Sequence, residues 1–132
     1  MSNTSNDLLI SIIIINYKVP EYLTNALRSL REANLNNSTE IIVVDNASND
    51  NSKEIIVDSF PEVTWISLKY NIGFGKACNV GAQNARGKYL LFLNPDTLVS
   101  KNILKVFVDF LEEHSDIGIV GPKIIDQDGT FQ

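Results

Sequence analysis

Several residue types that mark common protein classes are scarce in this chain. One cysteine, Cys78, excludes an internal disulfide and leaves no cysteine cluster that could hold a metal. One histidine, His114, leaves no Ser–His–Asp or Cys–His arrangement to assemble. No apolar run approaches the roughly 20 residues of a membrane span, and residues 1–7 lack the pattern of a signal peptide. We therefore expect a cytoplasmic protein.

Positive charge is also scarce. The 132 residues include 11 Lys and Arg against 16 Asp and Glu, for a net charge of −5. This balance lacks the basic surface typical of nucleic-acid-binding proteins, so we expect no nucleic acid as a partner. A phosphate-bearing ligand would instead depend on backbone amides, a lysine or a metal ion at one place in the fold.

What the chain does contain is a regular alternation of apolar runs with helical stripes. Runs rich in β-branched and other apolar residues predict strands, at 12–15, 41–44, 63–68, 89–93 and 117–120, with a short sixth at 124–125. Helices are predicted from Pro20, around 55–60, at 74–86 before Gly87, and after Ser100 as a cap. The expected buried stripes are Leu23, Ala26, Leu27 and Leu30 in the first helix and Ile103, Phe107, Phe110 and Leu111 in the last.

This alternation is typical of an α/β protein. We expect a three-layer α/β/α sandwich with a mostly parallel sheet and right-handed crossovers. The strands at 12–15, 41–44 and 89–93 are apolar enough to be covered on both faces, whereas 63–68 alternates and lies nearer an edge. Residues 1–10 are expected to be a frayed tail, 34–39 a polar loop, and 11–132 one domain.

Two of the predicted buried strands end in acidic residues. Asp45 follows the run 41–44, and Asn94-Pro95-Asp96 follows the run 89–93. In open α/β sheets, ligands bind outside the carboxyl ends of the strands. Asp96 could hold a hard divalent cation, which often takes one or two carboxylates plus substrate phosphates. Asn94 could add a neutral oxygen or bind a sugar hydroxyl. Simple turns would explain the same residues, and the spacing leaves both interpretations open.

A third candidate element is the stretch 71–79, which contains Gly73, Gly75 and Lys76. Glycines at the opening of a helix let a ligand approach the backbone, where the first amides attract anions. The dinucleotide fingerprint is incomplete, because Cys78 stands where a third glycine belongs. Close helix–sheet packing would also explain the glycines. Cys78 itself is expected to be a small packed side chain.

Taken together, these motifs resemble the family 2 glycosyltransferases of the GT-A fold, in particular the rhamnosyltransferase-like branch. Five segments carry the resemblance, in family order and over nearly the whole chain: 12–17 (IIIINY), 43–48 (VVDNAS), 71–79 (NIGFGKACN), 89–97 (YLLFLNPDT) and 121–123 (GPK). The resemblance implies a nucleotide-diphospho-sugar transferase fold of which this chain is a truncated, donor-binding portion.

The resemblance also implies roles for individual residues. Asn16, Tyr17 and Asp45 would line the nucleotide pocket, with Asp45 at the base or ribose. The far side of the pocket would be shaped by Asn71, Gly75, Lys76 and Asn79. Asn94-Pro95-Asp96 occupies the place of the family's Asp-x-Asp motif, where Asp96 would bind Mg²⁺ or Mn²⁺ and the diphosphate. The chain departs from the motif by carrying Asn94 where many members have an acid.

The implied activity is metal-assisted, inverting transfer of a sugar from a UDP- or dTDP-sugar to a saccharide or lipid-linked saccharide acceptor. We assign no catalytic base, which we expect beyond Gln132, since the chain ends 36 residues after Asp96. The full enzyme could associate peripherally with a membrane. Two alternatives remain: a fragment that binds nucleotide sugar without catalysing transfer, and an NAD-type dinucleotide domain.

Overall fold

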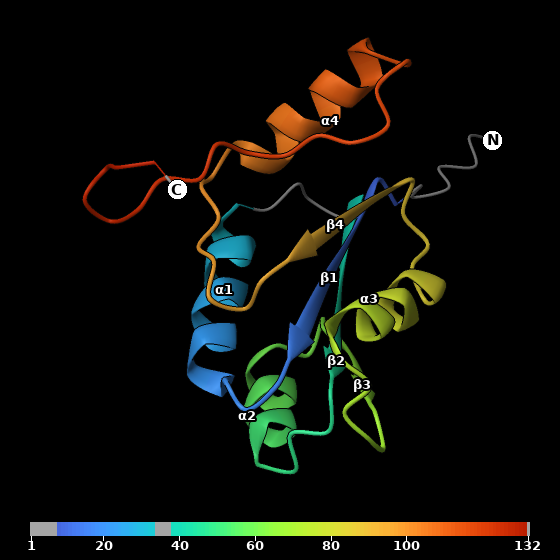
Figure 1. Ribbon diagram of the computed structural model, residues 1–132, viewed down its shortest axis with the longest axis vertical. Coiled ribbons are helices and arrows are strands. Elements are labelled where there is room, and N and C mark those ends of the chain that lie inside the picture. Colours follow the sequence, from blue (N-terminus) through green and yellow to red (C-terminus); the bar gives the residue numbers. More distant parts are fainter. Residues whose placement is uncertain (1–7, 34–37, 132) are drawn as a thin grey trace, which may run out of the picture.

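The apolar runs of the chain form a four-stranded parallel sheet. The structure is a computed structural model that describes residues 8–33 and 38–131. Its elements follow one another as β1 (Ile10–Asn16), α1 (Pro20–Glu32), β2 (Thr39–Asp45), α2 (Ser52–Ser59), β3 (Thr64–Ser67), α3 (Phe74–Gln83), β4 (Tyr89–Leu93) and α4 (Ile103–Glu113), as Figure 1 shows.

The order of the strands in the sheet is β3-β2-β1-β4, and every neighbouring pair is parallel. The last residues of β1 and β2, Asn16 and Asp45, lie side by side in register. On the other side of β1, Ile14 pairs with Leu93, the last residue of β4. Since all four strands run the same way, their carboxyl ends meet at one edge of the sheet.

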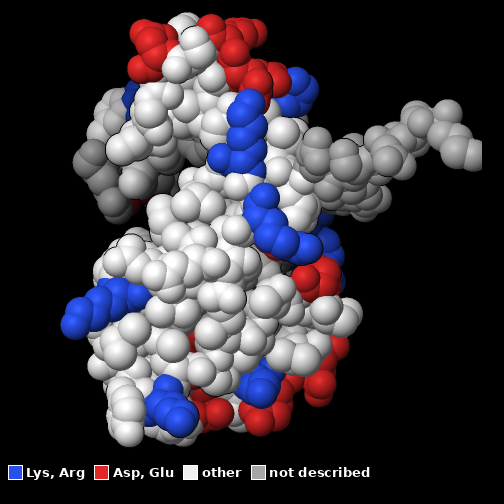
Figure 2. Space-filling view, turned by 90° about the vertical axis from the view of Figure 1, so that its right-hand side faces the viewer, with Lys and Arg blue, Asp and Glu red and all other residues white. Residues whose placement is uncertain are grey.

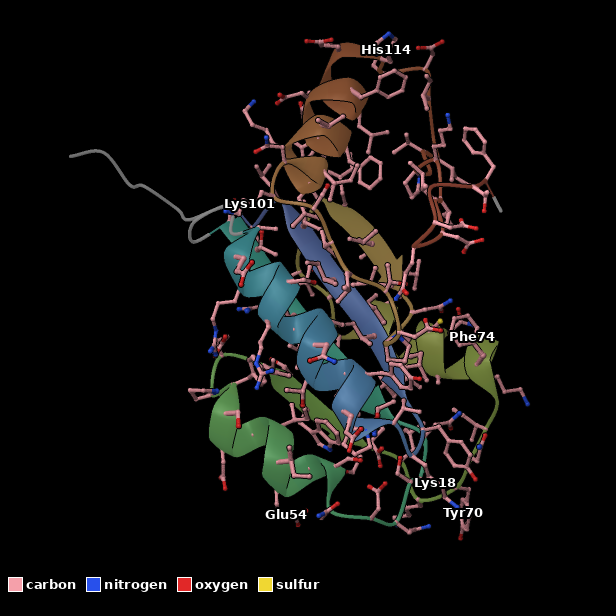
Figure 3. All side chains as sticks on the ribbon, turned by 90° about the vertical axis from the view of Figure 1, so that its left-hand side faces the viewer. Lys18, Glu54, Tyr70, Phe74, Lys101 and His114 are labelled. Carbon is pink, nitrogen blue, oxygen red and sulfur yellow. The ribbon has the colours of Figure 1, made fainter. Side chains whose placement is uncertain are left out.

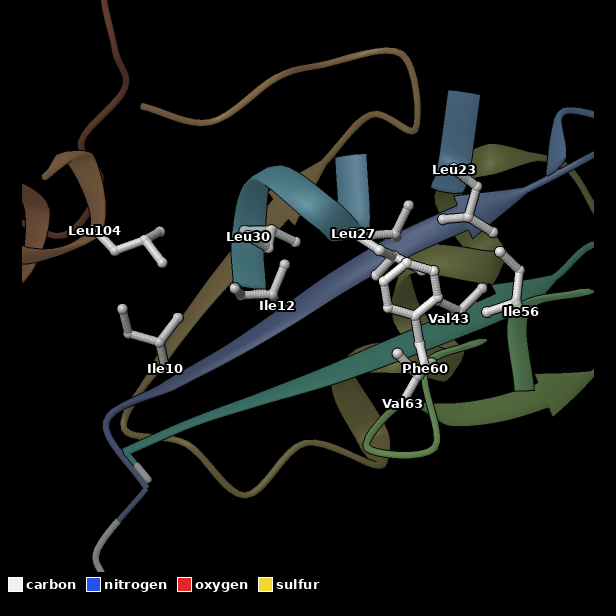
Figure 4. Close-up of a cluster of buried hydrophobic side chains, with 11 residues drawn as sticks. Ile10, Ile12, Leu23, Leu27, Leu30, Val43, Ile56, Phe60, Val63 and Leu104 are labelled. Atoms are coloured by element: carbon white, nitrogen blue, oxygen red, sulfur yellow. The ribbon is translucent and has the colours of Figure 1, made fainter. Parts of the chain in front are cut away.

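Helices cover the two faces of this sheet, which confirms the α/β sandwich (Figure 1). On one face, Ile12 and Ile14 pack with Leu27 of α1 and Ile56 of α2 (Figure 4). On the other face, Ile13 and its neighbours pack beneath α3. Because β1 is covered by packed side chains on both of its faces, all of its own side chains are buried. The stripe predicted for α1 is buried as well.

The strand β4 departs from the prediction, because one of its faces is not covered. Leu90 is 45% exposed and Phe92 is 48% exposed. In register they pair with Ser11 and Ile13, so their side chains point to the face on which α3 lies. That helix packs over β1 and β2 instead, and Figure 2 shows few charged side chains across the middle of this face. The prediction that β4 is buried on both faces is therefore wrong.

Close packing explains Gly87 better than a helix end does. The third helix ends at Gln83 and not at Arg86. The backbone N–H of Gly87 donates to Ser11 Oγ at 2.8 Å, and a Cβ at this position would lie 2.6 Å from the backbone nitrogen of Ser11. The glycine is thus required where the chain passes against β1 before entering β4.

A hydrogen-bonded network around Glu40 of β2 joins β1 to the chain that enters β4. Its Oε1 accepts from Ser11 Oγ at 2.6 Å and from the backbone N–H of Arg86 at 2.7 Å. Its Oε2 accepts from Arg86 Nη2 at 3.0 Å. Burial raises the pKa of Glu40, but the hydrogen bonds from Ser11 and Arg86 and the charge of Arg86 lower it by more, so its pKa lies below the ordinary value.

The chain after β4 contains the other departures. Residues 117–120 form no strand, and Ile119 is 91% exposed. The expected strand at 124–125 is reduced to one antiparallel bridge between Ile125 and Phe131. A strand needs a partner edge, and among the described residues none is paired with 117–120. Gly118 and the Gly121-Pro122 pair also disfavour a strand there.

The bounds of the last helix and of the tail also change. Asn102, not Ser100, precedes α4. Its most buried side chain is Leu104, while Phe110 is 38% exposed, so the buried stripe is rotated from the expected one. β1 begins at Ile10, inside the expected tail, because Ile10 pairs with both neighbouring strands. Residues 1–7, and 34–37 of the expected loop, lie outside the described residues.

Candidate functional site

The candidate site lies at the carboxyl edge of the sheet, in the loops that follow the four strands. Figure 3 labels Lys18 and Tyr70 at this end of the molecule and His114 at the opposite end. Every residue that the sequence nominated ends a strand, lies in the loop that follows one, or belongs to α3, which the loop after β3 leads into. The topology therefore brings the nominated segments to one edge.

Asn16 and Asp45 form the buried centre of the site. Asn16 is fully buried, and Asp45 is 8% exposed. The Asn16 side-chain Nδ2 donates to Asp45 Oδ1 at 2.8 Å. A buried carboxylate requires such donors, because an unpaired charge away from water is strongly unfavourable. The last residues of β1 and β2 are therefore in direct contact through their side chains.

Ser48 completes this centre and was not nominated by the sequence. Its Oγ donates to Asp45 Oδ1 at 2.5 Å and accepts from Asn16 Nδ2 at 3.2 Å and from the backbone N–H of Lys18 at 2.9 Å. Its own N–H donates to Asp45 Oδ2 at 3.2 Å. A serine three residues after a carboxylate is also typical of an ordinary turn. Only the hydrogen bonds to Asn16 and Lys18 show that Ser48 belongs to the buried centre of the site.

The backbone around this centre adopts left-handed conformations that are uncommon for residues other than glycine. Lys18 has φ of 57°, Ala47 of 61° and Asn49 of 51°. Such conformations cost free energy and persist where surrounding contacts impose them. The turn at Lys18 leaves the Tyr17 ring 45% exposed at the edge, with Lys18 Nζ 5.2 Å from its centroid.

The loop before α3 is tied to the end of β2 through Asn46. This side chain is 4% exposed, and its Oδ1 accepts from the backbone N–H of Ile72 at 2.9 Å. Asn71 Oδ1 in turn accepts from the backbone N–H of Gly73, at 3.0 Å, and Gly73 has φ of 82°. Asn71 therefore shapes the turn into α3, and Asn46, which the sequence did not nominate, anchors it.

The first turns of α3 present free groups at the surface. Gly73 precedes the helix and no side chain caps its first amides. Gly75, Lys76 and Asn79 are exposed, and a Cβ built on Gly75 would meet no atom within 4 Å. Uncapped amides and a lysine suit an anion. Burial raises the pKa of the Cys78 thiol in the same helix, which disfavours a nucleophilic role.

Asn94 and Asp96 lie in a turn after β4, in which the backbone N–H of Thr97 donates to Asn94 O at 3.2 Å. Both side chains are exposed. Among the described residues, the Asp96 carboxylate has no hydrogen bond or ion pair, and no group of three or more acidic, His or Cys side chains surrounds it. A free carboxylate with a neighbouring amide fits Mg²⁺ or Mn²⁺ only if a ligand supplies further oxygens.

The family model for glycosyl transferase family 2 matches residues 11–132. The chain belongs to this family. A family 2 relative from Bacillus subtilis (strain 168), the minor teichoic acid biosynthesis protein GgaB, is 32% identical over 124 residues, covering 90% of this chain and 14% of GgaB. The poly(ribitol-phosphate) beta-N-acetylglucosaminyltransferase TarS of Staphylococcus aureus is 30% identical, over 92% of this chain and 22% of TarS.

Solved structures agree with the family 2 assignment. TarS 1-349 in complex with UDP-GlcNAc superposes with a TM-score of 0.75 at 26% identity, over 89% of this chain and 40% of that one. The mannosyltransferase PcManGT of Pyrobaculum calidifontis, in complex with GDP-Man and Mn²⁺, shares the fold with a TM-score of 0.72 at 21% identity. The GT-A type of fold is thereby confirmed, while the rhamnosyltransferase-like branch stays a prediction.

The family 2 chain spans less than half the length of the curated relatives that it matches, from 14% of GgaB to 44% of an archaeal glycosyltransferase. Across the described residues, no helix is both long and apolar enough to cross a bilayer.

Proposed function

We propose that this chain is the donor-binding part of a glycosyltransferase that transfers a sugar from a UDP- or dTDP-sugar to a saccharide acceptor. The proposal rests on the presence of two carboxylates at the same edge of the sheet, Asp45, which is buried, and Asp96, which is exposed. Asp45 is held by Asn16 and Ser48, and Asp96 is exposed at the end of β4. The complex of TarS with UDP-GlcNAc, at 26% identity, supports a uridine nucleotide as the ligand.

Each part of the edge would bind a different part of the donor. Asp45 can accept from hydroxyl or N–H groups of the ribose or base, and the exposed Tyr17 ring offers a stacking surface. The uncapped amides of α3, with Lys76, would face negative charge. Asp96 and Asn94 would hold Mg²⁺ or Mn²⁺ together with the diphosphate, and a bound cation supplies charge stabilisation for the departing diphosphate.

The remaining parts of the proposal reach beyond this stretch of chain. Residues 11–132 would form the donor-binding portion, and the transfer would be inverting. The acceptor would be a saccharide or lipid-linked saccharide of the cell surface. The names of GgaB and TarS, which refer to teichoic acid and to poly(ribitol-phosphate), support a polymer of this general kind. The catalytic base stays unassigned. Cytoplasmic location and peripheral membrane association stay predictions.

Calorimetric titration of the chain with UDP, with and without MnCl₂, tests the proposal. We expect binding that Mn²⁺ strengthens and that Asp96→Asn weakens at least tenfold, about 1.4 kcal/mol. Asp116→Asn is the matched control, because it removes an exposed carboxylate beyond the far end of α4. Absence of UDP binding, or binding that neither Mn²⁺ nor Asp96→Asn alters, would contradict the proposal.

One alternative follows from the unassigned base: the chain binds the donor without catalysing transfer. A transfer assay with UDP-GlcNAc and a ribitol-phosphate polymer, comparing these 132 residues with a longer gene product, tests this alternative. Turnover by these 132 residues would exclude a binding-only role. The NAD-type alternative is not supported, because the glycosyl transferase family 2 model matches residues 11–132.

A further inference from the structure

We propose that Ser48 is the positioning residue of the donor site, because it fixes the Asp45 carboxylate in the orientation that receives the ligand. This inference rests on the proposed function and deepens it. It assigns a role to a side chain that would touch no ligand and would act through Asp45.

The Ser48 hydroxyl uses its whole hydrogen-bonding capacity within the chain. A serine hydroxyl has one donor and two acceptor positions. Here the donor goes to Asp45, and the acceptors receive Asn16 Nδ2 and the backbone N–H of Lys18. All three positions are used, and Ser48 is 2% exposed. The hydroxyl therefore has nothing left to offer a ligand, and its function lies in what it holds.

Ser48 makes the two oxygens of the Asp45 carboxylate unequal. Oδ1 accepts two bonds, from Asn16 at 2.8 Å and from Ser48 Oγ at 2.5 Å. Among the described residues, Oδ2 accepts one longer bond, at 3.2 Å, from the Ser48 backbone N–H. Two donors on one oxygen prevent rotation of the carboxylate, so Oδ2 keeps acceptor capacity for a donor group of the ligand.

Ser48 also links the turn after β1 to the loop after β2. Its hydroxyl joins the turn after β1, where Lys18 has φ of 57°, to the loop after β2, where Ala47 has φ of 61°. Both conformations are unfavourable without support. One side chain thus holds the two loops that would present Tyr17 and Asp45 to the same nucleotide.

A double-mutant cycle on UDP binding in the presence of MnCl₂ tests this inference. We expect Ser48→Ala to weaken UDP binding about tenfold, the size of one lost hydrogen bond to a charged group. In an Asp45→Ala chain, where no carboxylate remains to be positioned, Ser48→Ala should weaken binding less than threefold. A purely structural role would give the same loss in both chains.

Ser52→Ala is the matched control. Ser52 is also buried, at 1% exposure, but its backbone N–H donates to Asp50, and no hydrogen bond among the described residues links it to the Asp45 centre. It should alter UDP binding less than twofold. If melting curves show that Ser48→Ala is unfolded, Ser48→Cys replaces it, since a thiol of similar size donates and accepts weakly.

The outcomes separate this inference from the proposed function. No UDP binding by the unsubstituted chain overturns both. With UDP binding established, a Ser48→Ala loss below threefold in the unsubstituted chain, or above threefold in the Asp45→Ala chain, overturns the role of Ser48 and leaves the proposed function standing.

Discussion

The two halves of the carboxyl edge are built in opposite ways. At the ends of β1 and β2, Asn16, Asp45 and Ser48 are buried and bonded to one another. At the end of β4, Asn94 and Asp96 are exposed, and their side chains make no hydrogen bond to the other half among the described residues. The first half is held together by hydrogen bonds within the chain, whereas the second presents exposed side chains without such contacts among the described residues.

The sheet beneath explains this difference. β1 and β2 are covered by helices on both faces, so the chain can hold buried polar groups at their ends in fixed positions. β4 is an edge strand with Leu90 and Phe92 half-exposed on one face. A cation held by Asp96 together with a diphosphate would need less protein structure around it, because the diphosphate would supply further oxygen ligands.

The largest expected effect comes from comparing Ile13 with Phe92, which are neighbours in register on the same face. Ile13 is 1% exposed and Phe92 is 48% exposed. We expect Ile13→Ala to lower the free energy of unfolding by about 2–5 kcal/mol and Phe92→Ala by about 1 kcal/mol or less. Urea titrations followed by circular dichroism measure both. Equal losses would contradict the contrast between the two strands.

Gly81 and Gly75 provide a second comparison, within α3. A Cβ on Gly81 would overlap the Ile13 side chain, while one on Gly75 would meet nothing within 4 Å. Gly81→Ala should destabilise the chain by about 1–3 kcal/mol. Gly75→Ala should be neutral or stabilising by up to about 1 kcal/mol. The melting temperatures check this; a stabilising Gly81→Ala would mean that α3 packs less closely on β1.

A smaller effect is expected at Glu40, whose network joins β1 and β2 to the chain entering β4. Glu40→Gln should cost about 1 kcal/mol at neutral pH, because hydrogen bonds to an amide oxygen are weaker than those to a carboxylate. Urea titrations of both chains at neutral pH measure this cost.

The unsubstituted chain and the Glu40→Gln chain should also differ in how their stability responds to acid. Since folding lowers the pKa of Glu40, the carboxylate stabilises the fold above its ordinary pKa and loses this contribution as the pH falls through the folded value. The difference between the two chains should therefore shrink as the pH falls below the ordinary pKa of glutamate. A difference that is constant with pH would exclude this electrostatic origin.

The sequence predicted the structure of β1 and α1 better than that of β4 and the chain after it, for a physical reason. The apolar run of β1 and the stripe of Leu23, Leu27 and Leu30 in α1 carry their own periodicity, and both are buried as expected. The exposure of Phe92 depends on which strands α3 packs against, and no local sequence pattern determines that. The strand expected at 117–120 likewise depends on a partner edge.

The site followed the same rule. Asp45 could be nominated because it ends an apolar run, and Asn16 because of the resemblance to family 2 glycosyltransferases. The contact between them follows from the parallel register. Ser48 and Asn46 could not be nominated, because their spacing from Asp45 is that of any polar turn. Their roles arise from bonds to Lys18 and Ile72, which are far away in the sequence.

The most direct test of the account is to follow the backbone amide resonances of the isotope-labelled chain during titration with UDP and MgCl₂. We predict that the shifted resonances belong to the loops after β1, β2 and β4 and to the start of α3, and that Asp96→Asn removes the Mg²⁺-dependent part of the shifts. Shifts confined to α4 and the amino ends of the strands, or none at millimolar UDP, would contradict a donor site at the carboxyl edge.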